Sequence, residues 1–143
     1  MFIGQYNHTL DEKGRISVPT KFRSGLTEGC VVTRGLDRSL FLYPLSAWER
    51  LAEKLAALPL GKADTRAFAR LMLAGAMSVE IDGSGRIMIP QYLREYAGLT
   101  KRTVVTGLHD RIEIWDEETW NTYRMRTEAD GNDIAERLGE QGV

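Results

Sequence analysis

The sequence has few of the residues on which disulfides and metal centres depend. Cys30 is the single cysteine among 143 residues, so no disulfide can form within the chain and a CxxC metal site is excluded. Because Cys30 sits in the apolar segment GCVVT, we predict a buried strand residue and not a reactive thiol. The two histidines, His8 and His109, share no motif, and we expect a local structural role for each.

Long apolar runs and catalytic motifs are also missing. The longest uncharged apolar stretch, residues 71–79, is far shorter than the ~20 residues that cross a bilayer. The opening MFIGQYNHTLDEKGR has charges where a signal peptide would be apolar. We therefore expect a cytoplasmic protein that does not enter the membrane. Since no P-loop, HExxH or GxSxG is present, we expect no enzymatic activity, metal or cofactor.

Neither sign of charge dominates the chain. Its 43% hydrophobic and 27% charged residues are typical of a folded protein, and the net charge of −1 argues against a uniformly basic nucleic-acid binder. The distribution is uneven, because residues 1–75 carry 11 Lys and Arg against 7 Asp and Glu, whereas residues 76–143 carry 8 against 13. Residues 128–143 hold five acidic residues and one basic residue. We expect this end to be solvated and partly frayed.

The sequence does contain an internal repeat. LDEKGRISVPTKFR, starting at Leu10, recurs 71 positions later as IDGSGRIMIPQYLR, starting at Ile81. VVT at 31–33 returns at 104–106, and GLDRSLFLY at 35–43 is followed by GLHDRIEIW at 107–115. Two blocks in the same order indicate a duplication. The identical pairs of the first block are Asp11 and Asp82, Gly14 and Gly85, Arg15 and Arg86, Ile16 and Ile87, Pro19 and Pro90, and Arg23 and Arg94.

Each repeat predicts the order strand, turn, strand, short helix, strand, turn, strand. Asp-x-x-Gly fits a type I turn in which Gly supplies a positive φ. We therefore predict local hairpins that join residues 6–10 to 15–18 and residues 77–81 to 86–89. Pro19 and Pro90 end these strands and can open a short helix from its first position. CVVT and SLFLY then form two strands in the first half, as TVVT and RIEIW do in the second.

Helices connect and end the repeats. Ser46 and Glu49 form a capping-box pattern, and the segment Pro59-Leu60-Gly61 ends the helix that follows it. Further helices are predicted from about Asp64 and about Asp116. We expect a first repeat at residues 5–48, a helical connector at 49–75, a second repeat at 76–120, and a C-terminal helix with an acidic tail at 121–143. The expected fold class is mainly β with short helices (α+β).

The motif D-x-x-G-R-I-x-V/I-P, followed by a short helix with Arg, resembles the swapped-hairpin DNA-binding domain of AbrB and SpoVT. Two such units in a chain that opens MFIGQYNHTLDEKGR resemble the MraZ family, regulators associated with bacterial division and cell-wall gene clusters. The resemblance covers nearly everything before the acidic tail. It implies that the two halves interlock into one small AbrB-like β-barrel and that the chains assemble into closed rings.

The resemblance also implies a function. It indicates a sequence-specific transcriptional regulator, a repressor of its own gene-cluster promoter, which binds short direct repeats of double-stranded DNA and is nucleoid-associated. Arg15 and Arg86 would contact phosphate or guanine, although an Asp–Arg pair that braces each turn is an alternative, and both can hold. Lys13 lies in the first turn, where the second has Ser84. Lys21, Arg23 and Arg94 either reach phosphates or are solvated surface charges. The motif-supporting residues are Asp11, Gly14, Asp82 and Gly85.

Two other classes of function stay open. One is an antitoxin-like AbrB-domain module whose main task is to hold a partner protein. The other, more remote, is a barrel enzyme that cleaves itself at Gly-Ser to form a pyruvoyl group, as aspartate decarboxylase does. Gly83-Ser84 offers that dipeptide, but only in one half and inside a predicted turn.

Overall fold

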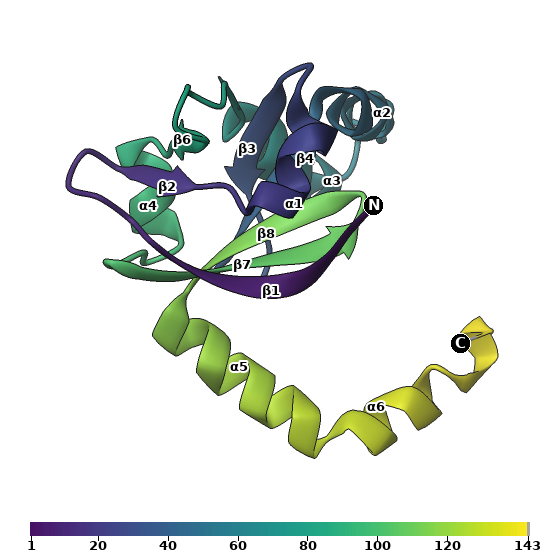
Figure 1. The fold of residues 1–143 in the computed structure, drawn as a ribbon. Coiled ribbons are helices and arrows are strands. Elements are labelled where there is room, and N and C mark those ends of the chain that lie inside the picture. The colour runs from purple at the N-terminus through teal and green to yellow at the C-terminus, as the bar shows by residue number, and fades with distance from the viewer. Residues whose placement is uncertain (143) are drawn as a thin grey trace.

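The computed structural model describes residues 1–142 and contains a six-stranded and a two-stranded antiparallel sheet with helices around them (Figure 1). The large sheet has the strand order β1 (Phe2–Thr9), β7 (Arg102–His109), β8 (Arg111–Asp116), β4 (Leu40–Pro44), β3 (Cys30–Arg34), β5 (Met77–Val79). The small sheet pairs β2 (Arg15–Ser17) with β6 (Arg86–Met88). The helices are α1 (Thr20–Arg23), α2 (Leu45–Ala56), α3 (Ala63–Ala69), α4 (Gln91–Tyr96), α5 (Glu117–Ala129) and α6 (Gly131–Arg137).

The two halves of the chain exchange strands. β1 of the first half pairs with β7 of the second along its whole length, β5 of the second half pairs with β3 of the first, and β2 pairs with β6. The strand–turn–strand segments predicted later in each repeat form, and their strands pair as β3–β4 and β7–β8. The two predicted hairpins are wrong in their pairing: each turn forms, but the strands beside it pair with the other half. An isolated two-stranded hairpin buries too little apolar surface to be stable, whereas interlocked halves share one core.

Both faces of the central strand β4 are covered. On β4, Leu40 and Leu42 point into the core under β2 and β6, while Phe41 and Tyr43 point to the opposite face, where α2 packs. Successive strand residues alternate between faces, so a strand with a continuous apolar run is buried on both sides. The larger core is closed by the small sheet and the two short helices, with fully buried side chains from Ile16, Ile87, Phe22 and Leu93. The fold is therefore the α+β, AbrB-like arrangement that the sequence predicts.

The helices differ from the predictions at their starts. α2 begins at Leu45 directly after Pro44 and has no side-chain cap, so the predicted capping box at Ser46 is wrong. Pro44, with its φ fixed by the ring, takes the N-cap position, so the helix starts two residues earlier than a cap at Ser46 would place it. Pro19 and Pro90 likewise directly precede α1 and α4 instead of being their first residues. The predicted helix start at about Asp116 is confirmed, because the Asp116 side chain accepts a hydrogen bond from the Thr119 backbone N–H and caps α5.

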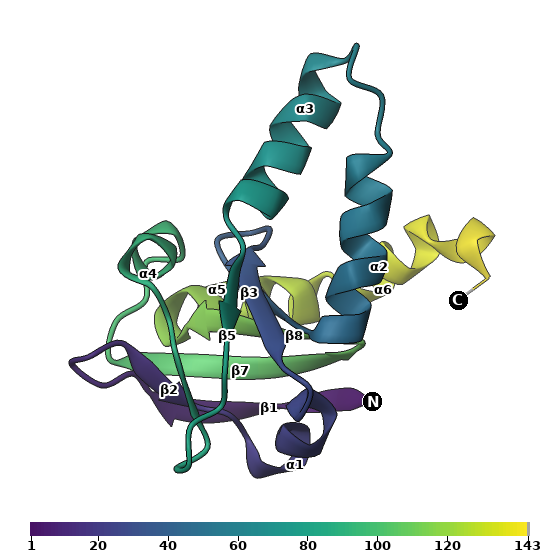
Figure 2. The same cartoon turned by 90° about the horizontal axis from the view of Figure 1, so that it is seen from above.

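Two helical arms leave the sheet. α2 and α3 form an antiparallel pair that projects from one side, and the chain returns from α3 through a π-helical segment, Arg70–Ala74, to β5 (Figure 2). α5 and α6 run away from the sheet toward the C-terminus (Figure 1). The acidic end is exposed, as expected, and its residues Gly131–Arg137 form α6. Within residues 1–142, every helix is too short or too polar to span a bilayer.

Cys30 lies in the buried part of β3. Its side chain is 2% exposed, and burial raises the pKa of its thiol to about 11. Because the thiolate is the nucleophile, we predict that iodoacetamide at pH 8 modifies native protein far more slowly than protein unfolded in guanidinium. Mass spectrometry resolves the two rates, since a single adduct reports a single site. Equal rates in the two states would contradict the burial of Cys30.

Candidate nucleic-acid interface

The two Asp-x-x-Gly turns have nearly the same geometry. In the first turn, Oδ1 of Asp11 accepts the backbone N–H groups of Lys13 at 2.9 Å and Arg15 at 2.8 Å, and the Gly14 N–H donates to the Asp11 carbonyl at 3.0 Å. In the second, Oδ1 of Asp82 accepts the N–H groups of Ser84 at 2.8 Å and Arg86 at 3.0 Å. The glycines have φ of +84° and +77°, as predicted. Each aspartate therefore organises its turn from inside.

The same carboxylates orient the arginines. Arg15 Nε donates to Asp11 Oδ2 at 2.7 Å and Arg86 Nε donates to Asp82 Oδ2 at 3.2 Å. A longer ion pair of 3.9 Å, between Arg86 Nη1 and Asp11 Oδ2, connects the two turns. Since Nε of each guanidinium is engaged, the Nη groups are the donors that remain for an acceptor, and of these, within residues 1–142, only Nη1 of Arg86 also lies near a carboxylate, that of Asp11. The bracing pair and a ligand contact are thus compatible in one side chain.

These carboxylates stay ionised. Hydrogen bonds from the backbone N–H groups of Arg15 and Arg86 are the largest cause that lowers the pKa of Asp11 and Asp82, respectively. The Arg15 and Arg86 side chains are 30% and 32% exposed, and ion pairs that solvent screens in this way contribute little to stability. The pairs therefore hold the guanidinium groups in place more than they stabilise the fold.

A local two-fold axis relates the two turns. In the β2–β6 pair, Ile16 lies opposite Ile87, its own equivalent in the repeat. Only a two-fold axis places equivalent residues opposite one another in this way. Arg15 and Arg86 stand on the outer face of this small sheet, where Arg15 lies opposite Met88 and Arg86 lies opposite Ser17. Met88 is 46% exposed between the two arginines, and the sequence analysis did not predict it there.

Arg23 and Arg94 support the turn of the opposite half. Arg23 Nε donates to the Val18 carbonyl at 2.9 Å, and Arg94 Nε donates to the Ile89 carbonyl at 3.0 Å. A Cβ atom built on Gly85 would overlap Arg23 Cζ, and one built on Gly14 would lie 2.9 Å from Arg94 Cζ. Each guanidinium therefore packs directly on the buried turn glycine. The sequence did not predict this contact between halves, although Gly and Arg stand at the same spacing in both repeats, which was a signal for it.

The remaining predicted residues are dispersed. The side chain of Lys13 is exposed in the first turn, beside Arg15. Lys21 lies on α1 and lines a hollow with Met1 and Ile3 at the start of β1, so the structure does not group it with the arginines. His8 lies near Arg23, and burial followed by the Arg23 charge lowers its pKa. His109 occupies the β7–β8 turn with a φ of +67°. A local structural role for the two histidines stays a prediction.

Comparison with known proteins identifies a family. The family model described as "MraZ protein, putative antitoxin-like" matches residues 1–71 and, separately, residues 72–141. Two matches in succession confirm the duplication. Among solved structures, the solution structure of PHS018 from Pyrococcus horikoshii is 13% identical, with 80% of this chain and 88% of that chain covered. Its TM-score of 0.33 is too low to support a conclusion about fold or function.

The close packing of Arg23 on Gly85 generates a prediction. Gly85→Ala should lower the free energy of unfolding by about 1–2 kcal/mol, because a residue with a Cβ is strained at positive φ and the guanidinium must move. Gly83→Ala, two residues away, is the matched control, since Gly83 has nothing within 4 Å of an added Cβ. Urea unfolding measures both. Equal effects of the two substitutions would contradict the proposed support of the turn.

Proposed function

Because the chain belongs to the MraZ family over both of its halves, we propose that it is a sequence-specific DNA-binding regulator that acts as a repressor at its own promoter. The observation that carries the proposal is the pair of oriented arginines, Arg15 and Arg86, on the outer face of the β2–β6 sheet. With Nε engaged, the two Nη groups of each guanidinium can donate end-on to phosphate oxygens or to guanine O6 and N7. The backbone of each turn is held by a hydrogen bond from the other half of the chain, from Ile89 N–H to the Gly14 carbonyl and from Val18 N–H to the Gly85 carbonyl.

The supporting cations have different proposed roles. Lys13 is exposed next to Arg15 and is placed to contact a phosphate. Arg23 and Arg94 engage Nε with backbone carbonyls and pack on the turn glycines, so they act mainly by positioning the turns. DNA binding by this chain would thus depend on two arginines and few other positive charges. We infer that one chain binds DNA weakly and with strong dependence on salt.

The first test of this proposal uses the two arginines. Arg15→Ala and Arg86→Ala should each weaken binding to DNA from upstream of the chain's own gene by about 1–3 kcal/mol, because each removes a charge-assisted contact. Footprinting locates the bound sites, and fluorescence anisotropy measures the affinity. Arg15→Lys should not restore full affinity if the contact is bidentate. Wild-type affinity in the double alanine variant, with an unchanged melting curve, would exclude these arginines as the DNA contacts.

We further propose that the chains form a closed ring. The α2–α3 arm exposes apolar side chains, with Leu60 at 81% and Phe68 at 38%, beyond what one chain covers. A repeated head-to-tail contact either closes into a ring or grows into a filament. A ring presents neighbouring turn pairs in the same sense, so it would bind direct repeats spaced by about one helical turn (~10 bp) or its multiples. Linked sites gain affinity through effective concentration, which offsets the weak single contact.

The ring generates its own prediction. Affinity should rise steeply between DNA with one repeat and DNA with two, and it should fall when half a helical turn is inserted between them, because the second site then faces away. Anisotropy measures this with duplexes that carry one, two or three repeats and with the two-repeat duplex that has the insertion, and light scattering gives the mass of the free protein. A monomer at micromolar concentration, or equal affinity for one repeat and three, would rule out multivalent binding by a ring.

A second candidate function rests on the words "antitoxin-like" in the family description. The α5–α6 arm exposes Met125 at 63% and Leu138 at 43%, a surface on which a partner protein could be held. Co-purification of a partner at fixed stoichiometry, together with no protected site in the footprint, would favour this alternative.

The self-cleaving barrel enzyme, the more remote alternative, predicts two fragments in an intact-mass measurement, split at Gly83-Ser84, whereas the regulator predicts one intact chain.

A further inference from the structure

The two turns are equivalent in backbone but not in the charges that flank them. The local two-fold axis superimposes the repeat on itself, so each flanking position of the first turn has a counterpart beside the second. By the spacing of the repeat, Thr9 corresponds to Glu80, Lys101 to Glu28, and Arg102 to Gly29. We name Thr9, Lys101 and Arg102 the first flank, and Glu80, Glu28 and Gly29 the second flank.

The first flank is basic and is joined to the first turn. Thr9 lies opposite Arg102 at the end of the β1–β7 pair, and the Leu10 N–H donates to the Lys101 carbonyl at 2.8 Å. The next residue is Asp11, where the turn begins. Lys101 and Arg102 are exposed, and within residues 1–142 neither has a carboxylate within 4.0 Å. Two unpaired cations therefore lie at the base of the turn that carries Lys13 and Arg15.

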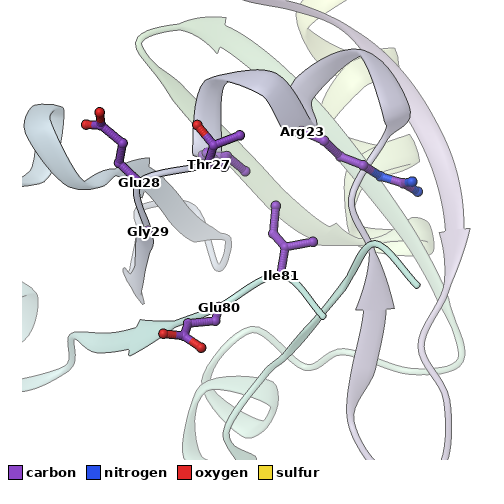
Figure 3. Close-up of a pocket in the computed structure, with 7 residues that line it drawn as sticks. Arg23, Thr27, Glu28, Gly29, Glu80 and Ile81 are labelled. Carbon is purple, nitrogen blue, oxygen red and sulfur yellow. The ribbon is translucent and has the colours of Figure 1, made fainter. Parts of the chain in front are cut away.

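The second flank is acidic and borders a hollow. A cavity of about 460 Å³ is lined by residues that include Glu28, Gly29, Glu80 and Ile81. Ile81 is the residue directly before Asp82, where the second turn begins. Figure 3 shows both carboxylate side chains to one side of Ile81, with the Arg23 guanidinium on the other. Both glutamates are exposed. Within the turns themselves the charges balance, because Glu12 and Lys13 of the first are replaced by Gly83 and Ser84 of the second.

Nearby acids reduce this contrast without removing it. Glu117 and Glu118, at the start of α5, share a hollow of about 530 Å³ with Lys101 and Arg102. Their counterparts in the first half, Leu45 and Ser46, are uncharged. Within residues 1–142, the first turn thus has two cations without an ion pair beside the acids Asp116, Glu117 and Glu118. The second has Glu28 and Glu80, and the Arg23 that lines their hollow is matched at the first turn by its equivalent Arg94, so the second flank itself adds only negative charge. At physiological salt such charges act over about 8 Å, so each flank influences its own turn most strongly.

We propose that the two turns bind DNA unequally, with Lys101 and Arg102 as additional phosphate contacts beside Arg15, and with Glu28 and Glu80 weakening the contact at Arg86. This inference rests on the proposed DNA-binding function. Cations near the backbone of DNA add affinity through counterion release, and carboxylates near it oppose binding.

Unequal turns would give each chain a direction on DNA. A unit with an unbroken two-fold axis binds equally well in both orientations and selects a palindrome. Once one turn binds more strongly than the other, the unit has one preferred orientation. Direct repeats require such a preferred orientation, because every unit must bind its repeat in the same sense. The flanks would thus give the unit a preferred orientation on DNA, which the symmetric β2–β6 pair alone does not have.

The test compares variants on a duplex from upstream of the chain's own gene and on a mixed-sequence duplex. Lys101→Ser with Arg102→Ser should weaken binding on the order of 10-fold at 0.1 M salt and reduce the slope of log affinity against log salt by about 2. The matched control is Arg50→Ser with Lys54→Ser on α2, which removes the same charge from exposed positions away from the turns. The control should leave the salt slope unchanged.

The reverse substitution tests the second flank. Glu28→Lys with Glu80→Thr gives the second flank the side chains of the first, and Gly29 is left in place because its φ is +109°. This variant should bind DNA several-fold more tightly than the wild type. In the variant, the loss of affinity caused by Arg15→Ala should exceed the loss caused by Arg86→Ala by less than it does in the wild type. Melting curves and light scattering confirm that the variants fold and assemble as the wild type does.

Three outcomes separate the hypotheses. A larger loss from Arg15→Ala than from Arg86→Ala, with the flank effects above, supports unequal turns. Equal losses from the two arginines, or a Lys101/Arg102 variant with wild-type affinity and salt slope, overturn the inequality and leave DNA binding intact. Failure of the wild-type protein to bind either duplex overturns the proposed function, and the inference falls with it.

Discussion

The interaction on which the structure depends is the closure of each turn by the other half of the chain. The Gly14 carbonyl accepts the Ile89 N–H at 2.8 Å, and the Gly85 carbonyl accepts the Val18 N–H at 2.9 Å. These two hydrogen bonds, together with the β2–β6 pairing, cross the junction between the halves at the small sheet. Neither half can complete its turn, its small strand or its core face without the other. The two copies of the repeat therefore fold together as one domain.

This closure explains how short segments hold functional side chains firmly. β2 and β6 have three residues each, too few to be stable alone, yet their central isoleucines are 1% exposed and anchor the pair on the core. Arg23 and Arg94 then cover the turn glycines from the opposite half. The Asp–Arg pairs add little stability because they are partly exposed, but on a fixed turn they determine where the guanidinium groups point.

The inside and the outside of the repeat have diverged to different degrees. Where the halves interlock, the buried equivalents are identical or similar, as Ile16 and Ile87 or Val18 and Ile89 are, because each must fit against the other half. The flanks are free of that constraint, and they carry opposite charges at Lys101 and Glu28. The helices that follow the repeats differ as well: α2 packs on the sheet with buried Ala47 and Leu55, whereas α5 has no fully buried residue. Symmetry is kept where packing requires it.

Local chemistry predicted the elements whose causes lie within a few residues. The Asp-x-x-Gly turns, the start of α5 at Asp116 and the burial of Cys30 were predicted because capping, positive φ and apolar surroundings are written in neighbouring residues. The repeat also identified Arg15 and Arg86. Tertiary structure decided which strand pairs with which, since backbone hydrogen bonds are the same for any partner and a hairpin pattern fits its own half as well as the other. For the same reason only the fold revealed Arg23 and Arg94 on the opposite turns, and placed Lys101 beside the first turn and Glu28 beside the second.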